Sequence, residues 1–396
     1  MKKQQVRRGR ILAALLSVTM LILAGGPLTG CSSPPPRVVP LVHAHPDTLL
    51  SQMSLREKVG QLFVIRPDQL MTSITETSVH DTKGKGATAL TDDMRAVLAQ
   101  YPAGGFAIFA KNIASPQQLI TFHTELRSAC RIVPLIAVDE EGGRVARVAN
   151  AKGFFVPNVG SMESIGRTGD PENARKAASD IGNYLAEYGF TMDFAPDADI
   201  NTNPDNRVIG DRAFGSDPQL VSEMVSAYLD GLHEHRILAV LKHFPGHGDT
   251  SEDTHSGYVA VHKTWDELLQ TELVPFVDHF DKADAVMVAH ITLDNVTDDG
   301  LPATLSHELV TGKLRGELGY DGLVITDALA MGAIESRYSS AEAAVMAFDA
   351  GCDVLLMPQN YTEAFDGILT AVEDGRISEE RLNESVMRIL RVKYRG

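Results

Sequence analysis

The feature that most constrains the fold is a regular alternation of short apolar runs with longer stretches of helical periodicity. Eight runs have the length and composition of buried strands: Gln61 to Ile65, Gly104 to Phe109, Pro134 to Val138, Met192 to Ala195, Leu238 to Leu241, Ala285 to Val288, Leu323 to Thr326 and Asp353 to Met357. Helical stretches between them include Pro171 to Tyr188, Asp217 to His233, Trp265 to Phe280 and Ser340 to Ala350. Such alternation implies right-handed crossovers between parallel strands. Eight units predict an α/β fold, a single (β/α)8 TIM barrel spanning residues 48–396.

Polar residues cluster where these predicted strands end. The set comprises Arg66, Asp68, Lys111, Asn112, Asp139, Asp197, Asp199, Lys242, His243, His290 and Asp327. In a barrel all the carboxyl ends of the strands meet at one mouth, where active sites lie. Residues far apart in sequence are therefore expected to share one pocket. For Asp68, Asp197 and Asp199 the alternative is a structural role, as a helix N-cap or a strand-end salt bridge.

The segment from Lys242 to His255 carries the densest group of ionisable side chains. It reads Lys-His-Phe-Pro-Gly-His-Gly-Asp-Thr-Ser-Glu-Asp-Thr-His and follows an apolar run. Three interpretations compete: an acid/base pair of Asp253 and His255, a polar loop that caps a strand, or a metal cluster. The metal cluster would use His243, His247, Asp249 and His255. The density of imidazoles and carboxylates favours an active-site loop over a simple cap.

Four segments in order resemble glycoside hydrolase family 3, in its β-N-acetylglucosaminidase branch. The segment Lys242 to His255 is similar to the signature of that branch, and Gly322 to Met331 is similar to the strand of the family that ends in its nucleophile. Ile136 to Arg147 and Val208 to Phe214 resemble the segments that hold the sugar. The resemblance runs from about Pro46 almost to the C-terminus and implies the same barrel fold.

The resemblance also implies catalytic roles. Asp327 matches the family's nucleophile, and His255 paired with Asp253 matches its acid/base. A neighbouring carboxylate orients an imidazole and raises its pKa, so that it can donate a proton near neutrality. Glycosidic cleavage needs these two functions, a nucleophile and a proton donor. The resemblance calls for no cofactor and no metal.

The sugar-binding residues are carried over in the same way. Asp139 matches the family's acceptor for two sugar hydroxyls, and the remaining matches are expected as donors: Arg147, Arg212, Lys242 and His243. The implied function is a retaining, exo-acting β-N-acetylglucosaminidase that releases terminal N-acetylglucosamine from cell-wall muropeptides. The alternatives are a phosphorylase or a β-glucosidase on the same site, a zinc metallohydrolase, and a sugar-binding lipoprotein without turnover.

The first thirty residues have the pattern of a targeting segment. A basic start precedes the apolar stretch Ile11 to Ala24, and Leu28-Thr29-Gly30-Cys31 resembles a bacterial lipobox. We therefore expect a signal peptide over residues 1–30, a lipid on Cys31 and a proline-rich tether over residues 31–47. The alternative is an ordinary signal peptide with a chance cysteine. A lipid anchor predicts an extracytoplasmic protein held on a bacterial membrane.

Charge and cysteine content narrow the remaining possibilities. The formal net charge of −16 argues against a nucleic-acid partner, because phosphate binding requires a basic face. Cys130 and Cys352 are expected as buried free thiols. Met71 to Gln100 is long for a connection between strands and predicts a mobile loop or a helical insertion at the mouth.

Overall fold

A computed structural model describes residues 45–71, 86–250 and 259–395 of the chain. These residues contain eight parallel strands that form one sheet. Their bounds are β1 Phe63–Ile65, β2 Gly105–Ile108, β3 Leu135–Val138, β6 Met192–Asp193, β7 Leu238–Phe244, β9 Ala285–Val288, β11 Leu323–Thr326 and β12 Leu355–Leu356. Each lies in or overlaps a predicted run, so the prediction of a (β/α)8 barrel is confirmed.

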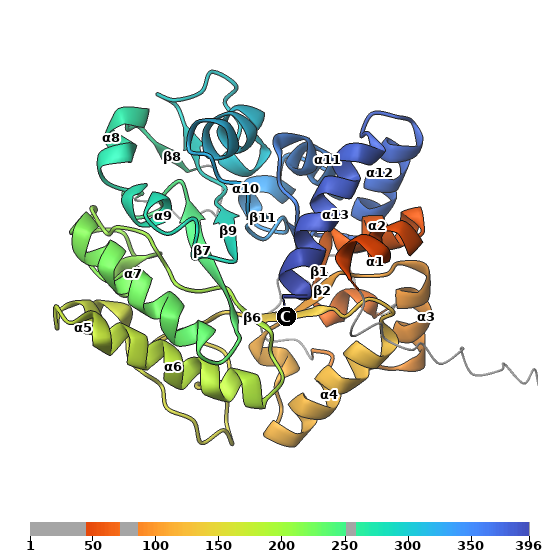
Figure 1. Cartoon of the computed structure of the whole chain (residues 1–396), viewed down its shortest axis with the longest axis horizontal. Coiled ribbons are helices and arrows are strands. Elements are labelled where there is room, and N and C mark those ends of the chain that lie inside the picture. The colour runs from red at the N-terminus through yellow and green to blue at the C-terminus, as the bar shows by residue number, and fades with distance from the viewer. Residues whose placement is uncertain (1–44, 72–85, 251–258, 396) are drawn as a thin grey trace, which may run out of the picture. The chain divides into compact units, whose positions relative to one another are not determined.

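The strands follow one another around the barrel in chain order. From β1 to β11 every strand of the sheet pairs in parallel with the next one, and β1 pairs with β12 through Phe63↔Leu355 and Val64↔Leu356. A parallel bridge between Ile325 and Val354 joins β11 to the segment that leads into β12. Helices lie around the strands, as Figure 1 shows for α4, α6, α7, α11 and α12. Because the sheet closes on itself, the carboxyl ends of all eight strands face the same side.

The larger helices begin where the sequence supplies capping residues. Ser115 and Ser339 cap α4 and α11 with reciprocal bonds to Gln118 and Glu342. The larger helices are α3 Asp92–Gln100, α4 Pro116–Ala129, α6 Pro171–Glu187, α7 Pro218–His233, α11 Ser340–Ala350, α12 Tyr361–Glu373 and α13 Glu379–Lys393. The short ones are α1 Pro46–Gln52, α2 Leu55–Gln61, α5 Met162–Gly166, α8 Trp265–Gln270, α9 Val274–Val277 and α10 Gly332–Glu335. Their apolar faces pack on strands whose residues are almost all buried.

One predicted helix differs from the structure. The stretch Trp265 to Phe280 was predicted as continuous, but it divides into α8 and α9. Thr271, the C-cap of α8, leaves the helical region with φ −132° and ψ −90°. Pro275 stands at the start of α9, where its missing N–H costs nothing. The periodicity of the apolar residues continues across the break, and this explains why it resembled one helix.

Other predictions fall partly or wholly outside the described residues. Of the segment Met71 to Gln100, the structure describes α3 and the residues just before it. The predicted signal peptide, the lipidated Cys31 and most of the tether lie outside the described part. Within the described part, every helix is too short or too polar to cross a bilayer. Cys130 and Cys352 are free and buried, as predicted.

Candidate active site

The carboxyl ends of the strands surround a cavity of about 570 Å³, which we call the mouth cavity. Six residues singled out from the sequence line it: Asp139, Arg147, Arg212, Lys242, His243 and Asp327. They come from segments almost two hundred residues apart and meet because β3, β7 and β11 end on the same side. Lys242 and His243 lie within β7 rather than after it, since that strand continues to Phe244.

Lys242 links two carboxylates at the floor of the mouth cavity. Its side chain is only 2% exposed, and its Nζ lies 2.9 Å from Asp139 Oδ1 and 2.5 Å from Glu141 Oε1. Burial alone would lower the pKa of Lys242, but Asp139 and Glu141 raise it above the ordinary value. Arg147 Nη2 lies 3.6 Å from the other oxygen of Asp139. Lys242 is therefore a fixed cation, and Asp139 is held as a carboxylate between two donors.

Glu141 is a site residue that we did not single out from the sequence. It is buried and receives Arg212 through two bonds, Nε to Oε2 at 2.7 Å and Nη2 to Oε1 at 2.8 Å. Arg212 and Lys242 together hold the pKa of Glu141 below its ordinary range, against the effect of burial. The signal was present in the alternation of the chain: Asp139 and Glu141 are two residues apart and point to the same side.

Glu140, between them, points the other way and fixes the next turn. Its carboxylate accepts the N–H groups of Val148 and Ala149, each at 2.8 Å, and the hydroxyl of Tyr184 at 2.9 Å. Burial raises the pKa of Glu140. These bonds anchor the backbone directly after Arg147 and thereby help to place its guanidinium beside Asp139.

Asp327 follows β11 and is partly exposed to the mouth cavity. Its N–H donates to the carbonyl of Val288 on the neighbouring strand at 2.8 Å. Its Oδ1 accepts the N–H of Ala328 at 2.7 Å. The backbone thus fixes the carboxylate at a strand end, on the wall of the mouth cavity.

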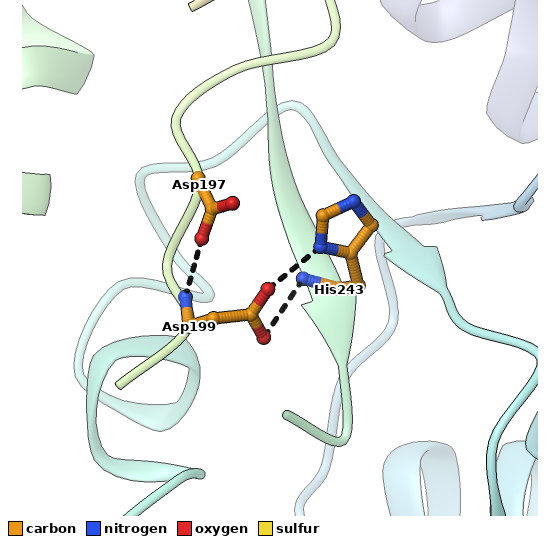
Figure 2. A group of neighbouring side chains, drawn as sticks. All are labelled: Asp197, Asp199 and His243. Atoms are coloured by element: carbon orange, nitrogen blue, oxygen red, sulfur yellow. Dashed lines mark hydrogen bonds and ion pairs between the residues drawn. The ribbon is translucent and has the colours of Figure 1, made fainter. Parts of the chain in front are cut away.

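Two further carboxylates, those of Asp197 and Asp199, lie beside His243 (Figure 2). Asp199 Oδ2 lies 2.7 Å from His243 Nδ1, and the Asp199 N–H donates to Asp197 Oδ1 at 3.0 Å. Both carboxylates are fully buried. Burial and the charge of Asp199 raise the pKa of Asp197 to about 7. For Asp197 and Asp199 the sequence left a purely structural role open. That description is incomplete, because Asp199 contacts His243, whose side chain lines the mouth cavity.

This group also bears on the metal hypothesis. Donor atoms of Asp197, Asp199 and His243 lie within 4.8 Å of one another. However, the positive charge beside these atoms is that of Arg212. Its Nη2 lies 3.4 Å from Asp197 Oδ2 and 3.2 Å from His243 Nε2. Two of the metal ligands proposed from the sequence have protein partners. Asp249 Oδ1 lies 3.7 Å from the ammonium group of Lys263. His247 Nδ1 bonds the hydroxyl of Thr250 at 2.8 Å.

The predicted acid/base pair, Asp253 and His255, lies outside the described residues. The chain that leads toward it is closely held. Gly246 has φ +119°, and an added Cβ would lie 2.5 Å from Glu272, so that only glycine fits. Glu272 is itself buried and pairs with Lys263, which follows β8 Ala260–Val261.

Asp68 takes part in a strand-end salt bridge, which was the structural alternative for this residue. Its Oδ1 accepts the N–H of Ala87 at 2.6 Å and the amide of Asn112 at 3.3 Å. Lys111 and Arg66 lie 3.6 Å and 3.4 Å from Oδ2. Asp68 therefore ties the ends of β1 and β2 together beside the mouth cavity.

Comparison with known proteins identifies the family. Residues 54–392 match the glycosyl hydrolase family 3 N-terminal domain. The chain belongs to this family. The predicted resemblance is confirmed, including its β-N-acetylglucosaminidase branch, and the enzyme class is glycoside hydrolase.

Named relatives agree with this assignment. β-Hexosaminidase A of Pseudoalteromonas piscicida is 34% identical over 333 residues, which are 77% of this chain and 56% of that protein. β-Hexosaminidase LpqI of Mycobacterium tuberculosis is 33% identical over 407 residues, 97% of each chain. The solved structure of a family 3 β-N-acetylglucosaminidase from Paenibacillus matches with a TM-score of 0.79 at 38% identity, over 87% of this chain and 62% of that one. The chain thus spans little more than half of the first relative and nearly all of the second.

Proposed function

We propose that the chain is a retaining β-N-acetylglucosaminidase that removes terminal, non-reducing, β-linked N-acetylglucosamine. The observation that carries this proposal is the shared cavity of Asp327 and the ion-paired set around Lys242. A carboxylate beside hydroxyl-binding donors and acceptors is what cleavage of a glycosidic bond requires. The names of the relatives support N-acetylglucosamine as the sugar.

The proposed reaction has two steps. In the first, an oxygen of Asp327 bonds to the anomeric carbon, the glycosidic C–O bond breaks, and His255 gives a proton to the leaving oxygen. In the second, His255 takes a proton from water, the water oxygen bonds to the anomeric carbon, and the bond to Asp327 breaks. Two inversions give net retention. The roles of His255 and of Asp253, which would orient it, come from the sequence resemblance.

The paired charges would grip the sugar ring. Asp139 is ionised between Lys242 and Arg147, so it accepts hydrogen bonds from hydroxyl groups. Lys242 and Arg147 also have donor capacity beyond these pairs. Because Glu141 holds Arg212 through both of its oxygens, the donors stay in position when no sugar is bound.

The natural substrate and the location belong to the same proposal. We infer that the glycans are cell-wall muropeptides, and that a lipid on Cys31 holds the enzyme on a membrane outside the cytoplasm. This rests on the lipobox-like sequence. Replacement of Cys31 with Ala should release the protein from the membrane fraction, and recovery of the variant with the membranes would contradict the anchor.

Hydrolysis of an aryl β-N-acetylglucosaminide tests the activity. We expect turnover in EDTA, a smaller rate on the matching β-glucoside, and the same products with and without phosphate. Formation of N-acetylglucosamine 1-phosphate would instead favour the phosphorylase alternative, in which a phosphate oxygen replaces water in the second step. Loss of activity in EDTA would favour the metallohydrolase. Binding of the sugar without turnover would favour a non-catalytic binding protein.

A further inference from the structure

The carboxylate of Asp199 is surrounded by donors whose directions are fixed. Its Oδ1 accepts the backbone N–H of His247 at 2.6 Å and that of His243 at 3.4 Å. Its Oδ2 lies 2.7 Å from His243 Nδ1 (Figure 2). Backbone N–H groups can only donate, so Oδ1 is committed and Oδ2 faces the imidazole.

The other nitrogen of the same ring has a partner that decides its protonation. His243 Nε2 lies 3.2 Å from Arg212 Nη2, and a guanidinium has donors but no acceptor. Nε2 must therefore offer its lone pair. The proton of the neutral ring is then on Nδ1, where it is donated to Asp199 Oδ2. The direction of both bonds follows from the partners alone.

We propose that Asp199 is a positioning residue for sugar binding, because it fixes His243 with its proton on Nδ1. When a sugar binds, one of its hydroxyls replaces Arg212 as the donor to the single lone pair of Nε2, while Arg212 keeps its two bonds to Glu141. His243 lines the mouth cavity, and a hydroxyl that reaches its edge must donate. This differs from the donor role that the family resemblance implied for His243. The inference rests on the proposed function of the cavity.

The charges around the ring are consistent with a neutral imidazole. Burial, Arg212 and Lys242 together lower the pKa of His243 to about 4, against the opposite effects of Asp197 and Asp327. The charge and the backbone N–H of His247 lower the pKa of Asp199, against the effect of burial. Burial raises the pKa of both Asp197 and Asp199, and the charge of Asp199 raises that of Asp197 further.

An Asp199→Asn substitution should reverse this arrangement. The two backbone N–H groups keep the amide oxygen of the new side chain in the place of Oδ1. Its NH2 group then points at His243 Nδ1, which has to become the acceptor. The ring proton moves to Nε2, where it meets Arg212 and would donate to a substrate instead of accepting.

Nitrogen-15 NMR of the free enzyme tests the tautomer without any substrate. The His243 signals are assigned by their loss in His243→Gln. We expect a protonated Nδ1 and an unprotonated Nε2, unchanged between pH 5 and 9, and the reverse pattern in Asp199→Asn. A protonated Nε2 in the wild type, or titration near pH 6.5, would overturn the proposal even if the variant failed to fold.

Kinetics with fluorinated sugars test whether His243 Nε2 accepts a hydrogen bond from a sugar hydroxyl. Fluorine can accept but cannot donate, so at one ring position the wild type should prefer hydroxyl over fluorine by about tenfold or more in kcat/KM. That preference should fall toward unity in Asp199→Asn. Asp193→Asn is a matched control, because Asp193 is also buried, accepts a backbone N–H of Glu140 at 2.9 Å and has a pKa that burial raises well above its ordinary value.

The outcomes separate two failures. An unchanged preference in Asp199→Asn, or an equal loss in Asp193→Asn, would overturn the positioning role. No preference at any position in the wild type would overturn the acceptor role. If the wild type cleaves none of the aryl glycosides, the proposed function fails, and the NMR result still decides the tautomer.

Discussion

Two lysines at opposite ends of the barrel show how the same residue type can serve chemistry or structure. Lys242, at the mouth, is almost fully buried and meets Asp139 and Glu141, which raise its pKa. Lys393, at the other end, is partly exposed and donates to neutral oxygens, Gln61 Oε1 at 2.7 Å and Gly104 O at 2.6 Å. Burial lowers its pKa to about 7. A shifted pKa alone therefore does not mark a functional lysine, and the charge of its partners does.

Two aspartates show a contrast of another kind. Asp353, beside the amino end of β12, receives Arg315 at 2.6 Å, Arg388 at 3.3 Å and Ser385 at 2.5 Å. Its oxygens are thus occupied by the protein itself. Asp327, at the mouth, is fixed by backbone bonds and is partly open to the cavity.

The largest expected effect separates these aspartates. Asp327→Asn should lower kcat on an aryl β-N-acetylglucosaminide by about 10⁴-fold or more, because an amide cannot form the glycosyl ester. The amide oxygen can still accept the N–H of Ala328, so the thermal midpoint should change little. Asp353→Asn should instead cost about 3–5 kcal/mol of stability, because it breaks buried ion pairs, and leave kcat of the folded protein unchanged. The contrast fails if both variants lose activity equally at full folding.

The two lysines should differ in stability. Lys242→Met leaves two carboxylates without a shared cation, although Arg147 and Arg212 remain, so we expect a loss of about 3 kcal/mol. Lys393→Met removes bonds to two neutral oxygens and should cost about 1 kcal/mol. Urea unfolding at pH 7 measures both. Equal losses would show that the charge of the partners does not matter.

The pH dependence of stability sharpens the same comparison. Lys393 has a folded pKa below its ordinary value of 10.5, so between pH 7 and 10.5 the unfolded chain binds more protons. The free energy of unfolding of the wild type, relative to Lys393→Met, should therefore rise with pH across this window. Lys242 has a raised pKa, so its contribution is complete below pH 10.5 and is lost only above it. A flat difference for Lys393→Met would contradict this assignment.

The smaller of the two pH effects concerns Asp197. Its folded pKa of about 7 lies above its ordinary value of 3.8, so the folded state keeps a proton that the unfolded chain releases. The stability of the wild type relative to Asp197→Asn should fall as pH rises from 4 to 7 and then level off. Urea unfolding at several pH values measures this difference. A difference that stays constant would place the proton elsewhere.

The fold could be predicted in detail because barrel strands are buried on both faces. Strands such as Leu323–Thr326 and Ala285–Val288 contain no charged residue and therefore stand out as apolar runs. Their predicted bounds agree with the structure at both ends. Trp265 to Phe280 could not be divided correctly, because its apolar spacing continues through the break at Thr271.

The site was predicted less completely, for a physical reason. Asp139, Lys242 and Asp327 stand at strand ends, where topology alone brings them together. Glu141 and Asp199 act through other side chains, and such pairing depends on three-dimensional distances that spacing along the chain does not give. For Glu141 the available signal was its spacing, because it stands two residues after Asp139 and so points to the same side. For Asp199 the sequence offered a strand end and nothing that linked it to His243.

The most direct test of the account is to trap the covalent intermediate. A 5-fluoro-N-acetylglucosaminyl fluoride should form the glycosyl-enzyme faster than water removes it, since fluorine destabilises the oxocarbenium-like transition states. After rapid quenching and proteolysis, mass spectrometry should place the added sugar on Asp327, in the peptide that contains Leu323–Thr326. A sugar attached to another residue would contradict the account, as would inversion of the anomeric carbon in the product.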